Sequence, residues 1–217
     1  SLSFAKSMEY TVKGMYLMVY ANAILLLAWS IKSAVDSVGT ADYVVGLATG
    51  AGVPALLVPL VIFLVSMFIS FTTGTSWGTF GVMMPIAIPM AWKLATAQGV
   101  DPYIVTFASI ASVFAGGIFG DHCSPISDTT IMSSMFSAAD HIDHVNTQIP
   151  YAVLAAGVGI VLYLLFALGI THWAILLPIG VILLIVLHRA INVWYAKRVG
   201  LPPVVPNYLV GSEETSS

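Results

Sequence analysis

Long runs of apolar residues alternate with short polar stretches along the whole chain. Apolar segments occupy residues 14–35, 53–97, 102–138, 150–170 and 173–195. A helix that crosses the roughly 30 Å hydrocarbon core of a bilayer needs about 20 mainly apolar residues. The first, fourth and fifth segments have about that length, whereas the second and third are too long for one straight crossing. The pattern predicts an all-α membrane protein, a helical bundle without a soluble domain.

Polar interruptions divide the two longest segments. The second segment is interrupted by Thr72–Thr79, and the third by Gly116–Gly117 and then by Gly120–Asp128. Irregular backbone at membrane depth is tolerated only where it is buried in protein or lines a wet cavity. Interrupted apolar segments are also the best sequence indication of a transporter's binding site. We therefore expect a re-entrant hairpin from the second segment and a broken transmembrane helix from the third.

The composition agrees with a membrane protein and excludes several other classes. Of the 217 residues, 59% are hydrophobic and 8% are charged, against roughly 25% charged residues in soluble domains. The net charge of -3 provides no basic surface for nucleic acid. The single Cys123 rules out a disulfide within the chain, and neither a CxxC pattern nor a phosphate-binding GxxxxGKS/T motif occurs. We expect a protein that is not an enzyme and has no cofactor.

Basic residues near the ends of apolar segments predict how a membrane protein is oriented. They lie near both ends of this chain, at Lys6, Lys13, Arg189, Lys197 and Arg198. Both ends are therefore expected on the cytoplasmic side, which requires an even number of crossings. The number is four if the second segment returns to the side from which it entered. We expect a transmembrane domain over residues 1–200 and a disordered polar tail over residues 201–217.

The strongest chemical signal is the stretch Gly120–Thr130, which carries two carboxylates between apolar flanks. A charge at the bilayer centre costs about 2.5–3.5 kcal/mol on insertion scales, so such residues indicate function. The alternative is a plain loop outside the membrane, but the stretch contains no Lys or Arg. A desolvated carboxylate binds either a proton or a small hard cation such as sodium. We predict Asp121 and Asp128 as the exchanging acids and sodium ligands, supported by the hydroxyls of Ser124, Ser127 and Thr129.

Hydroxyl side chains also gather at the interruption of the second segment, where Gly74 and Gly78 flank a possible turn. The simpler interpretation is a membrane helix whose Ser and Thr pack against its neighbours. The functional interpretation is a hairpin tip that meets the broken third segment through Thr75 and Ser76. It predicts four substrate contacts at the tip: Thr73, Thr75, Ser76 and Thr79.

A third polar cluster, Asp140–His144, separates the third and fourth segments. Two histidines three residues apart suggest a metal site, but a solvated loop is the simpler interpretation, and a pH-sensing role remains open. His122 either tunes the acids of the main motif or hydrogen bonds to a backbone carbonyl. Cys123 is expected to be a packing residue.

The sequence FGDHCSPISDTTI of residues 119–131 resembles the signature of NhaC-type sodium/proton antiporters, and residues 27–31, 74–81 and 140–152 resemble the same family. The resemblance extends over about residues 10–195. It implies sodium/proton exchange in a prokaryotic inner membrane and a fold of two inverted repeats, each with a re-entrant hairpin and an unwound helix. Family members are about twice as long, so the resemblance implies that this chain is the C-terminal half of such a transporter.

Alternatives to sodium/proton exchange remain open from the sequence. Some relatives exchange malate and lactate with sodium and protons, so an organic-acid exchanger is the main alternative. An intramembrane aspartyl protease is disfavoured because both acids lie on one broken segment, and a structural or regulatory membrane subunit is a further alternative. The expected partners are membrane lipid, sodium and protons, together with a missing N-terminal half, a partner chain or further copies in a homo-oligomer.

Overall fold

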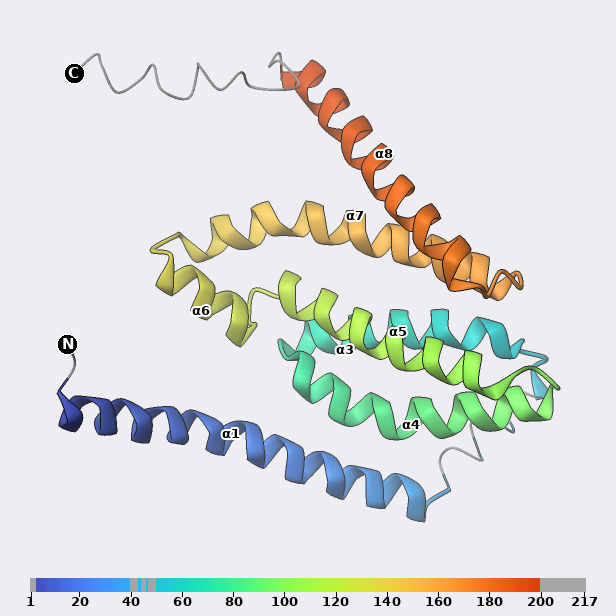
Figure 1. The fold of residues 1–217 in the computed structure, drawn as a ribbon, viewed down its shortest axis with the longest axis horizontal. Coiled ribbons are helices and arrows are strands. Elements are labelled where there is room, and N and C mark those ends of the chain that lie inside the picture. Colours follow the sequence, from blue (N-terminus) through green and yellow to red (C-terminus); the bar gives the residue numbers. More distant parts are fainter. Residues whose placement is uncertain (1–2, 40–42, 44–45, 47–49, 200–217) are drawn as a thin grey trace.

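The computed structural model describes residues 3–39, 43, 46 and 50–199, and these residues form helices joined by short connections (Figure 1). No strand occurs among them, which confirms the predicted all-α class. The predicted tail over residues 201–217 lies outside the described residues. The elements are α1 (Phe4–Ser37), the short helix η1 (Ala55–Leu57), α3 (Val58–Thr73), α4 (Ser76–Ala97), α5 (Pro102–Cys123), α6 (Asp128–Phe136), α7 (His141–Ala167) and α8 (Trp173–Val199).

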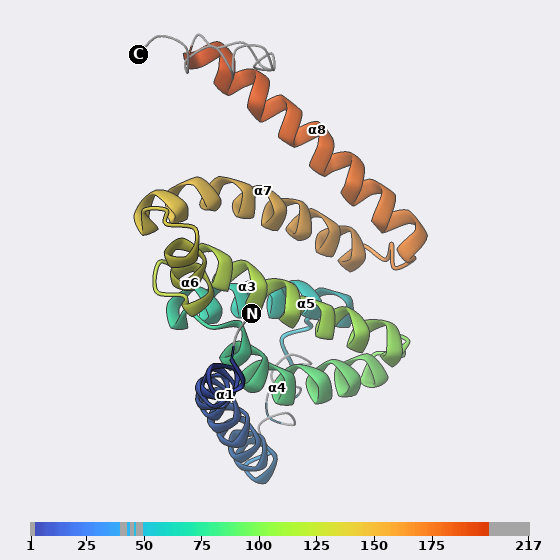
Figure 2. The same ribbon diagram turned by 60° about the vertical axis from the view of Figure 1, so that its left-hand side comes forward.

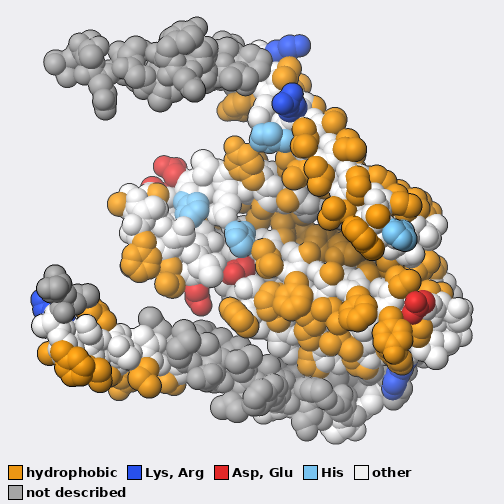
Figure 3. Space-filling view, in the orientation of Figure 1, with side chains coloured by type: hydrophobic (Ala, Val, Ile, Leu, Met, Phe, Trp, Pro, Cys, Tyr) orange, Lys and Arg blue, Asp and Glu red, His pale blue; other side chains and the backbone are white. Residues whose placement is uncertain are grey.

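Five helical stretches of the described chain are long and apolar enough to cross a membrane, judged by length and composition. They are Ala55–Thr73, Ser76–Ala97, Pro102–Cys123, His141–Ala167 and Trp173–Arg198. Figure 3 shows apolar side chains over the middle of one face, with charged side chains closer to its ends. The protein is thus a multi-pass membrane protein, as predicted. The number of crossings and the side on which each end lies remain predictions.

The second apolar segment folds into two helices, α3 and α4, that turn back on each other at Gly74 (Figure 1). The base of this pair is closed by Gln98, whose side chain donates to the Val53 carbonyl at 2.7 Å and accepts from the Ala55 amide at 2.8 Å. The predicted interruption is therefore a tight turn that joins two helices. Both α4 and the stretch formed by η1 and α3 are long enough to cross the membrane, so the re-entrant path stays a prediction.

One predicted interruption of the third segment is wrong, because α5 runs without a break through Gly116 and Gly117 to Cys123. These glycines allow α3 to pack closely against α5. A Cβ atom on Gly116 would lie 2.5 Å from the Phe63 carbonyl oxygen, and the Ser70 hydroxyl donates to the Gly117 carbonyl. Small residues let membrane helices pack with their backbones close together. The break in the segment is confined to residues 124–127, between α5 and α6.

The interpretation of Asp140–His144 as a solvated loop is also wrong, and the fourth apolar segment begins earlier than predicted. Asp140 is the N-cap of α7, and its carboxylate accepts from the amides of Ile142 and Asp143. The first turns of α7 are polar, so a search for apolar runs places the start at Pro150, which lies inside the helix. Side-chain capping of the free amides stabilises a helix start that hydropathy misses.

The core lies where α3, α4 and α5 meet, with η1 at its edge. α7 packs on α5, α1 lies along α4, and α8 packs mainly on α7 and diverges from the rest of the bundle (Figure 2). Buried side chains of the core include Val58, Ile62, Met83, Ala87, Ala91, Leu94, Val105 and Val113. This packing holds the turn between α3 and α4 at the same end of the bundle as the break between α5 and α6 (Figure 1).

Candidate functional site

The break between α5 and α6 follows from one proline and two capping serines. Pro125 disfavours helical backbone at the residue before it, and Ser124 is accordingly extended, with φ -75° and ψ 128°. The Ser124 amide donates to the Gly120 carbonyl and ends α5. Ser127 is the N-cap of α6, and its hydroxyl accepts from the Thr130 amide at 3.4 Å. Both serines are fully buried, whereas Pro125 and Ile126 between them are exposed, so the break turns its two capping serines toward the interior.

The turn between α3 and α4 packs directly against this break. Gly74 ends α3 in the left-handed region, with φ 69°, a conformation that glycine adopts without strain. A Cβ atom at Gly74 would lie 2.7 Å from the Ile126 carbonyl oxygen, so only glycine allows the turn to approach so closely. Thr75 then caps α4 by accepting from the Gly78 amide.

Asp121 lies where these two irregular elements meet, and only 5% of it is exposed. Its Oδ2 accepts from the Ser76 hydroxyl at 3.0 Å, and its Oδ1 accepts from the Ser127 hydroxyl at 2.6 Å. Ser76 is the first residue of α4, and Ser127 caps α6. The prediction that the tip of the hairpin meets the broken segment is therefore correct for Ser76.

Further hydroxyls extend the network around the Asp121 carboxylate. The Thr129 hydroxyl lies 2.9 Å from the Ser127 hydroxyl, and the Thr130 hydroxyl donates to the backbone carbonyl of Asp121 at 3.2 Å. The hydroxyl of the predicted ligand Ser124 accepts from the Ile126 amide at 3.4 Å, and Ser124 forms no hydrogen bond with the carboxylate. The centre thus combines one buried carboxylate with several hydroxyl oxygens.

The second predicted acid has different surroundings. Asp128 is exposed and is the first residue of α6, where the positive end of the helix dipole favours a carboxylate. It forms no hydrogen bond or ion pair with Asp121 or the hairpin tip in the part of the chain that the structure describes. Its predicted role as an exchanging acid stays a prediction.

The remaining predicted tip residues have local partners. The Thr73 hydroxyl is exposed and donates to the Ile69 carbonyl at 2.7 Å. The Thr79 hydroxyl is fully buried and donates to the Thr75 carbonyl at 2.9 Å. Neither side chain hydrogen bonds to Asp121. Their predicted contact with substrate stays a prediction.

Three residues that the sequence reasoning did not connect to the main motif join its network. The Ser134 hydroxyl of α6 donates to the Thr130 carbonyl at 2.8 Å and lies 3.1 Å from Nδ1 of His141 and 2.8 Å from Nδ1 of His144. Nε2 of His141 lies 2.7 Å from the Pro125 carbonyl oxygen. The two histidines were noticed as a pair, but no signal in the sequence indicated that they fold back onto the break. Among the described residues, no group of three or more His, Cys, Asp or Glu side chains is placed to hold a metal ion.

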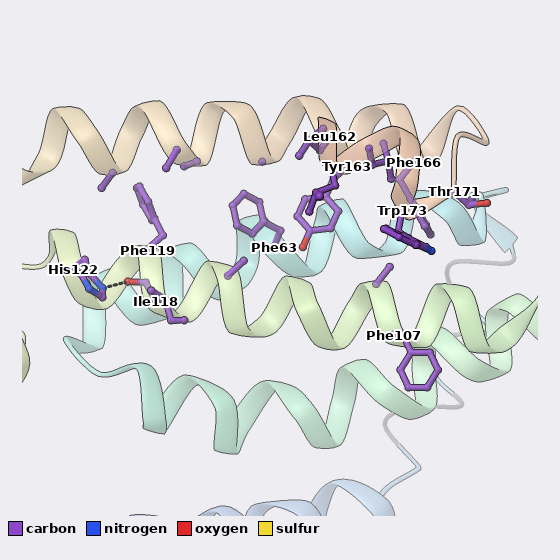
Figure 4. A pocket seen from close by; sticks show the side chains of 18 of the residues that line it. Phe63, Phe107, Ile118, Phe119, His122, Leu162, Tyr163, Phe166, Thr171 and Trp173 are labelled. Carbon is purple, nitrogen blue, oxygen red and sulfur yellow. Dashed lines mark hydrogen bonds between the residues drawn. The ribbon is translucent and has the colours of Figure 1, made fainter. Parts of the chain in front are cut away.

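A separate cavity of about 920 Å³ lies between α5, α7 and α8. Figure 4 shows Phe63, Tyr163 and Trp173 among the aromatic side chains that line it. At one end lies His122, whose Nδ1 is 2.8 Å from the Ile118 carbonyl oxygen, so the backbone-bonded alternative for His122 is correct. Asp121 does not line this apolar cavity, which is therefore distinct from the carboxylate centre.

Comparison with known proteins gives a consistent result. A family described as the Na+/H+ antiporter family matches residues 1–168. An uncharacterized protein of Haemophilus influenzae is 42% identical over 145 residues, which are 67% of this chain and 26% of that protein. The Na(+)/H(+) antiporter NhaC of Alkalihalophilus pseudofirmus is 33% identical over 102 residues, 47% of this chain and 20% of its own. The Malate-2H(+)/Na(+)-lactate antiporter of Bacillus subtilis is 30% identical over 100 residues, 46% of this chain and 20% of its own.

The family match covers the helices α1 to α7 and the whole of the Asp121 centre. The chain spans only part of the length of these relatives, since the matched regions are between a fifth and about a quarter of each. No solved structure matches the chain. The family match and the names of the relatives indicate a transporter and not an enzyme, and they confirm the resemblance to NhaC-type proteins. The chain belongs to the Na+/H+ antiporter family.

Proposed function

We propose that the protein exchanges sodium ions for protons across the membrane, and that Asp121 binds both in turn. The observation that carries the proposal is the place of this carboxylate. It is buried, and it accepts hydrogen bonds from hydroxyls that belong to two different irregular elements, the α3–α4 turn and the α5–α6 break. Ionisable residues inside a membrane domain mark ion and proton pathways in transporters.

The oxygen atoms around Asp121 suit a small hard cation. Carboxylate and hydroxyl oxygens are the ligand types that hard cations prefer. Ser76 and Ser127 supply hydroxyls within hydrogen-bonding distance of the carboxylate, and Thr129 supplies a third next to Ser127. A sodium ion at this place takes the lone pairs of these oxygens while the ionised carboxylate balances its charge.

The same hydroxyls serve the protonated state. A serine hydroxyl has one proton to donate and two lone pairs that accept. When Asp121 is ionised, Ser127 donates to it. When Asp121 is protonated, its own hydroxyl donates to Ser127, which turns its proton toward Thr129, 2.9 Å away. Sodium and the proton thus compete for the same oxygens, so one leaves when the other binds, and their movements are coupled.

In this proposal, Asp128 has a secondary role. Because it is exposed at the start of α6, it attracts cations toward the break without being desolvated. It is separated from Asp121 by six residues of the same stretch. We assign the competition between ions to Asp121 and the capture of cations to Asp128.

The proposal places the protein in a prokaryotic inner membrane, with both ends on the cytoplasmic side and with the α3–α4 pair as a re-entrant hairpin. The chain spans only part of its relatives. We therefore propose that a second, inverted repeat in an N-terminal half supplies the counterpart of this hairpin and broken helix, either on the same polypeptide or on a partner chain.

A sodium- and proton-coupled organic-acid exchanger is the second candidate. It is favoured by the Malate-2H(+)/Na(+)-lactate antiporter among the relatives and by the N-terminus of α4 at the centre, since helix N-termini bind carboxylates. The charge of Asp121 opposes a second anion beside it unless sodium lies between the two. Proton flux driven by an imposed gradient of malate or lactate, in place of the sodium gradient, distinguishes the two candidates, because only the organic-acid exchanger responds to it.

The test is proton flux into proteoliposomes that contain a pH-sensitive dye and carry an imposed sodium gradient. The wild-type protein is expected to move protons against sodium, and Asp121→Asn to give only the flux of protein-free liposomes, because the amide cannot exchange a proton. Asp101→Asn is the matched control, since Asp101 caps α5 by accepting from the Tyr103 amide and asparagine caps equally well. Wild-type flux in Asp121→Asn would overturn the proposal.

A further inference from the structure

The apolar cavity between α5, α7 and α8 is long and narrow. Its lining runs along α7 from Gln148 to Phe166, which is about 27 Å of helix at about 1.5 Å per residue and is close to the roughly 30 Å of a bilayer's hydrocarbon core. A volume of about 920 Å³ over this length gives a mean cross-section of roughly 34 Å², less than half of the roughly 80 Å² that an α-helix about 10 Å wide occupies. An extended hydrocarbon chain therefore fits the cavity, whereas another helix does not.

Small side chains on two facing helices make this space. The small lining residues are Ala108 and Ala115 on α5 and Ala152, Ala155, Ala156 and Gly159 on α7. Apolar cavities do not hold water, and an empty cavity loses dispersion contacts along its whole lining. The occupant must therefore be apolar over most of its length.

One end of the cavity is polar. His122 lies at this end and Trp173 at the other (Figure 4). Gln148 and Tyr151 of α7 line the cavity at the His122 end. The side-chain oxygen of Gln148 is buried and has no hydrogen-bond partner among the described residues. Buried polar atoms are ordinarily hydrogen bonded, so the occupant is expected to bring a polar group to this end.

α8 brings positive charge to the same end. The ring centroids of His188 and Tyr151 are 6.2 Å apart, and Arg189 is the next residue of α8. α8 carries Lys197 and Arg198 in its last turn and contains no Asp or Glu. No acidic side chain is among the described residues that line the cavity. Basic pockets between membrane helices on the cytoplasmic side bind anionic headgroups, and the proposed orientation puts this end of α8 on that side.

We propose that the cavity binds one phospholipid with an anionic headgroup. One acyl chain lies along the cavity toward Trp173, and the phosphate lies at the end formed by His122 and Gln148, beside Arg189. A glutamine amide both donates and accepts, so Gln148 pairs with a headgroup that carries phosphate oxygens and hydroxyls, as in phosphatidylglycerol. This site is separate from the Asp121 centre, and the inference goes beyond the proposed function.

The test is native mass spectrometry of the full chain in detergent, with phosphatidylglycerol or phosphatidylcholine of the same acyl chains. The wild type is expected to retain one phosphatidylglycerol, and to prefer it over phosphatidylcholine by on the order of tenfold, the effect of one charge-assisted contact. Ala155→Phe places a ring in the cavity and should lower retention by on the order of tenfold. Ala174→Phe is the matched control, since Ala174 is exposed on α8 and does not line the cavity, and it should bind as the wild type does.

Two further variants separate the headgroup from the acyl chain. Arg189→Gln keeps the cavity but removes a charge, so the preference for phosphatidylglycerol over phosphatidylcholine should fall toward one. Phosphatidylglycerol that is brominated near the end of its acyl chains should quench the fluorescence of Trp173, measured as the difference between the wild type and Trp173→Phe. This measurement places the chain in the cavity even if Ala155→Phe does not fold.

Four outcomes overturn the inference. They are a wild type that retains no phosphatidylglycerol, equal retention of the two lipids, a folded Ala155→Phe that binds as the wild type does, and Trp173 fluorescence that the brominated lipid leaves unchanged. A doubled mass that Ala155→Phe abolishes would overturn it too, because the cavity would then receive a second copy of the chain. None of these measurements uses a sodium gradient, so a failure of sodium/proton exchange leaves this inference standing, and the reverse holds as well.

Discussion

Asp121 and Asp128 belong to one polar stretch, yet the structure gives the two acids opposite surroundings. Asp121 is 5% exposed, and its carboxylate accepts a hydrogen bond from one hydroxyl of each of the two irregular elements. Asp128 is exposed at the first turn of α6. A buried carboxylate is costly unless hydrogen bonds compensate the loss of water, whereas an exposed one at a helix start is stabilised by water and by the helix dipole.

This difference shows that the break between α5 and α6 gives the two acids different surroundings. α5 carries Asp121 into the interface with α4, and the chain then turns at Pro125 before α6 begins at Asp128. The two acids are on different helices with different axes, so neither the spacing nor the residue type tells which is buried. The following predictions test whether the contrast between a desolvated and a solvated acid holds.

After Asp121→Asn, the largest effect is expected for Ser127→Ala. This change removes the 2.6 Å hydrogen bond to Asp121 and the N-cap of α6 together. A hydrogen bond to a charged group is worth about 1.5–3 kcal/mol, so the apparent sodium affinity in the proteoliposome assay should fall by up to on the order of 100-fold. The lost N-cap should separately lower the stability of the protein by about 1 kcal/mol. Ser124→Ala is the control, because its hydroxyl does not reach the carboxylate. Equal losses in both variants would contradict the assignment.

Gly74→Ala should lower the stability of the protein by about 2 kcal/mol. Alanine is strained at φ 69°, and its Cβ would lie 2.7 Å from the Ile126 carbonyl, which pushes the tip away from the break. Gly99→Ala is a matched control, with φ 70° and no atom within 4 Å of the added carbon, and should cost about 1 kcal/mol. Thermal unfolding in detergent measures both. A larger loss in Gly99→Ala would show that the tip does not pack as described.

Ser76→Ala should reduce the apparent sodium affinity by on the order of tenfold, the worth of one hydrogen bond to a charged group. Its bond to Asp121 is 3.0 Å long, and Ser76 does not cap a helix. The measurement is the dependence of proton flux on sodium concentration. Unchanged affinity in this variant, alongside a loss in Ser127→Ala, would separate the hairpin tip from the ion site.

Asp128→Asn should have the smallest effect. Removing one exposed charge at the start of α6 costs about 0.3–1 kcal/mol of stability, and the loss of cation capture raises the sodium concentration needed for half-maximal flux by only a few-fold. Thermal unfolding and the flux assay measure the two effects. Complete loss of flux would instead make Asp128 an exchanging acid equal to Asp121, as the sequence alone predicts.

Much of the fold could be predicted because apolar length and helix breakers act locally. The turn at Gly74 and the break at Pro125 follow from glycine and proline geometry, which neighbouring residues cannot override. The two errors have different causes. Gly116 and Gly117 predict flexibility when the helix is considered alone, but α3 packs against them and the helix continues. The start of α7 was missed because Asp140 stabilises it by capping, without an apolar residue.

The sequence by itself determined the membrane class and the two irregular elements, because burial in lipid and backbone geometry depend on residue type and order. Only the tertiary structure decided which acid is desolvated, that Ser76 reaches it from 45 residues away, and that His141 returns to the break. Those contacts arise from how helices pack across long stretches of chain. No local pattern encodes which face of α5 meets the tip of the hairpin.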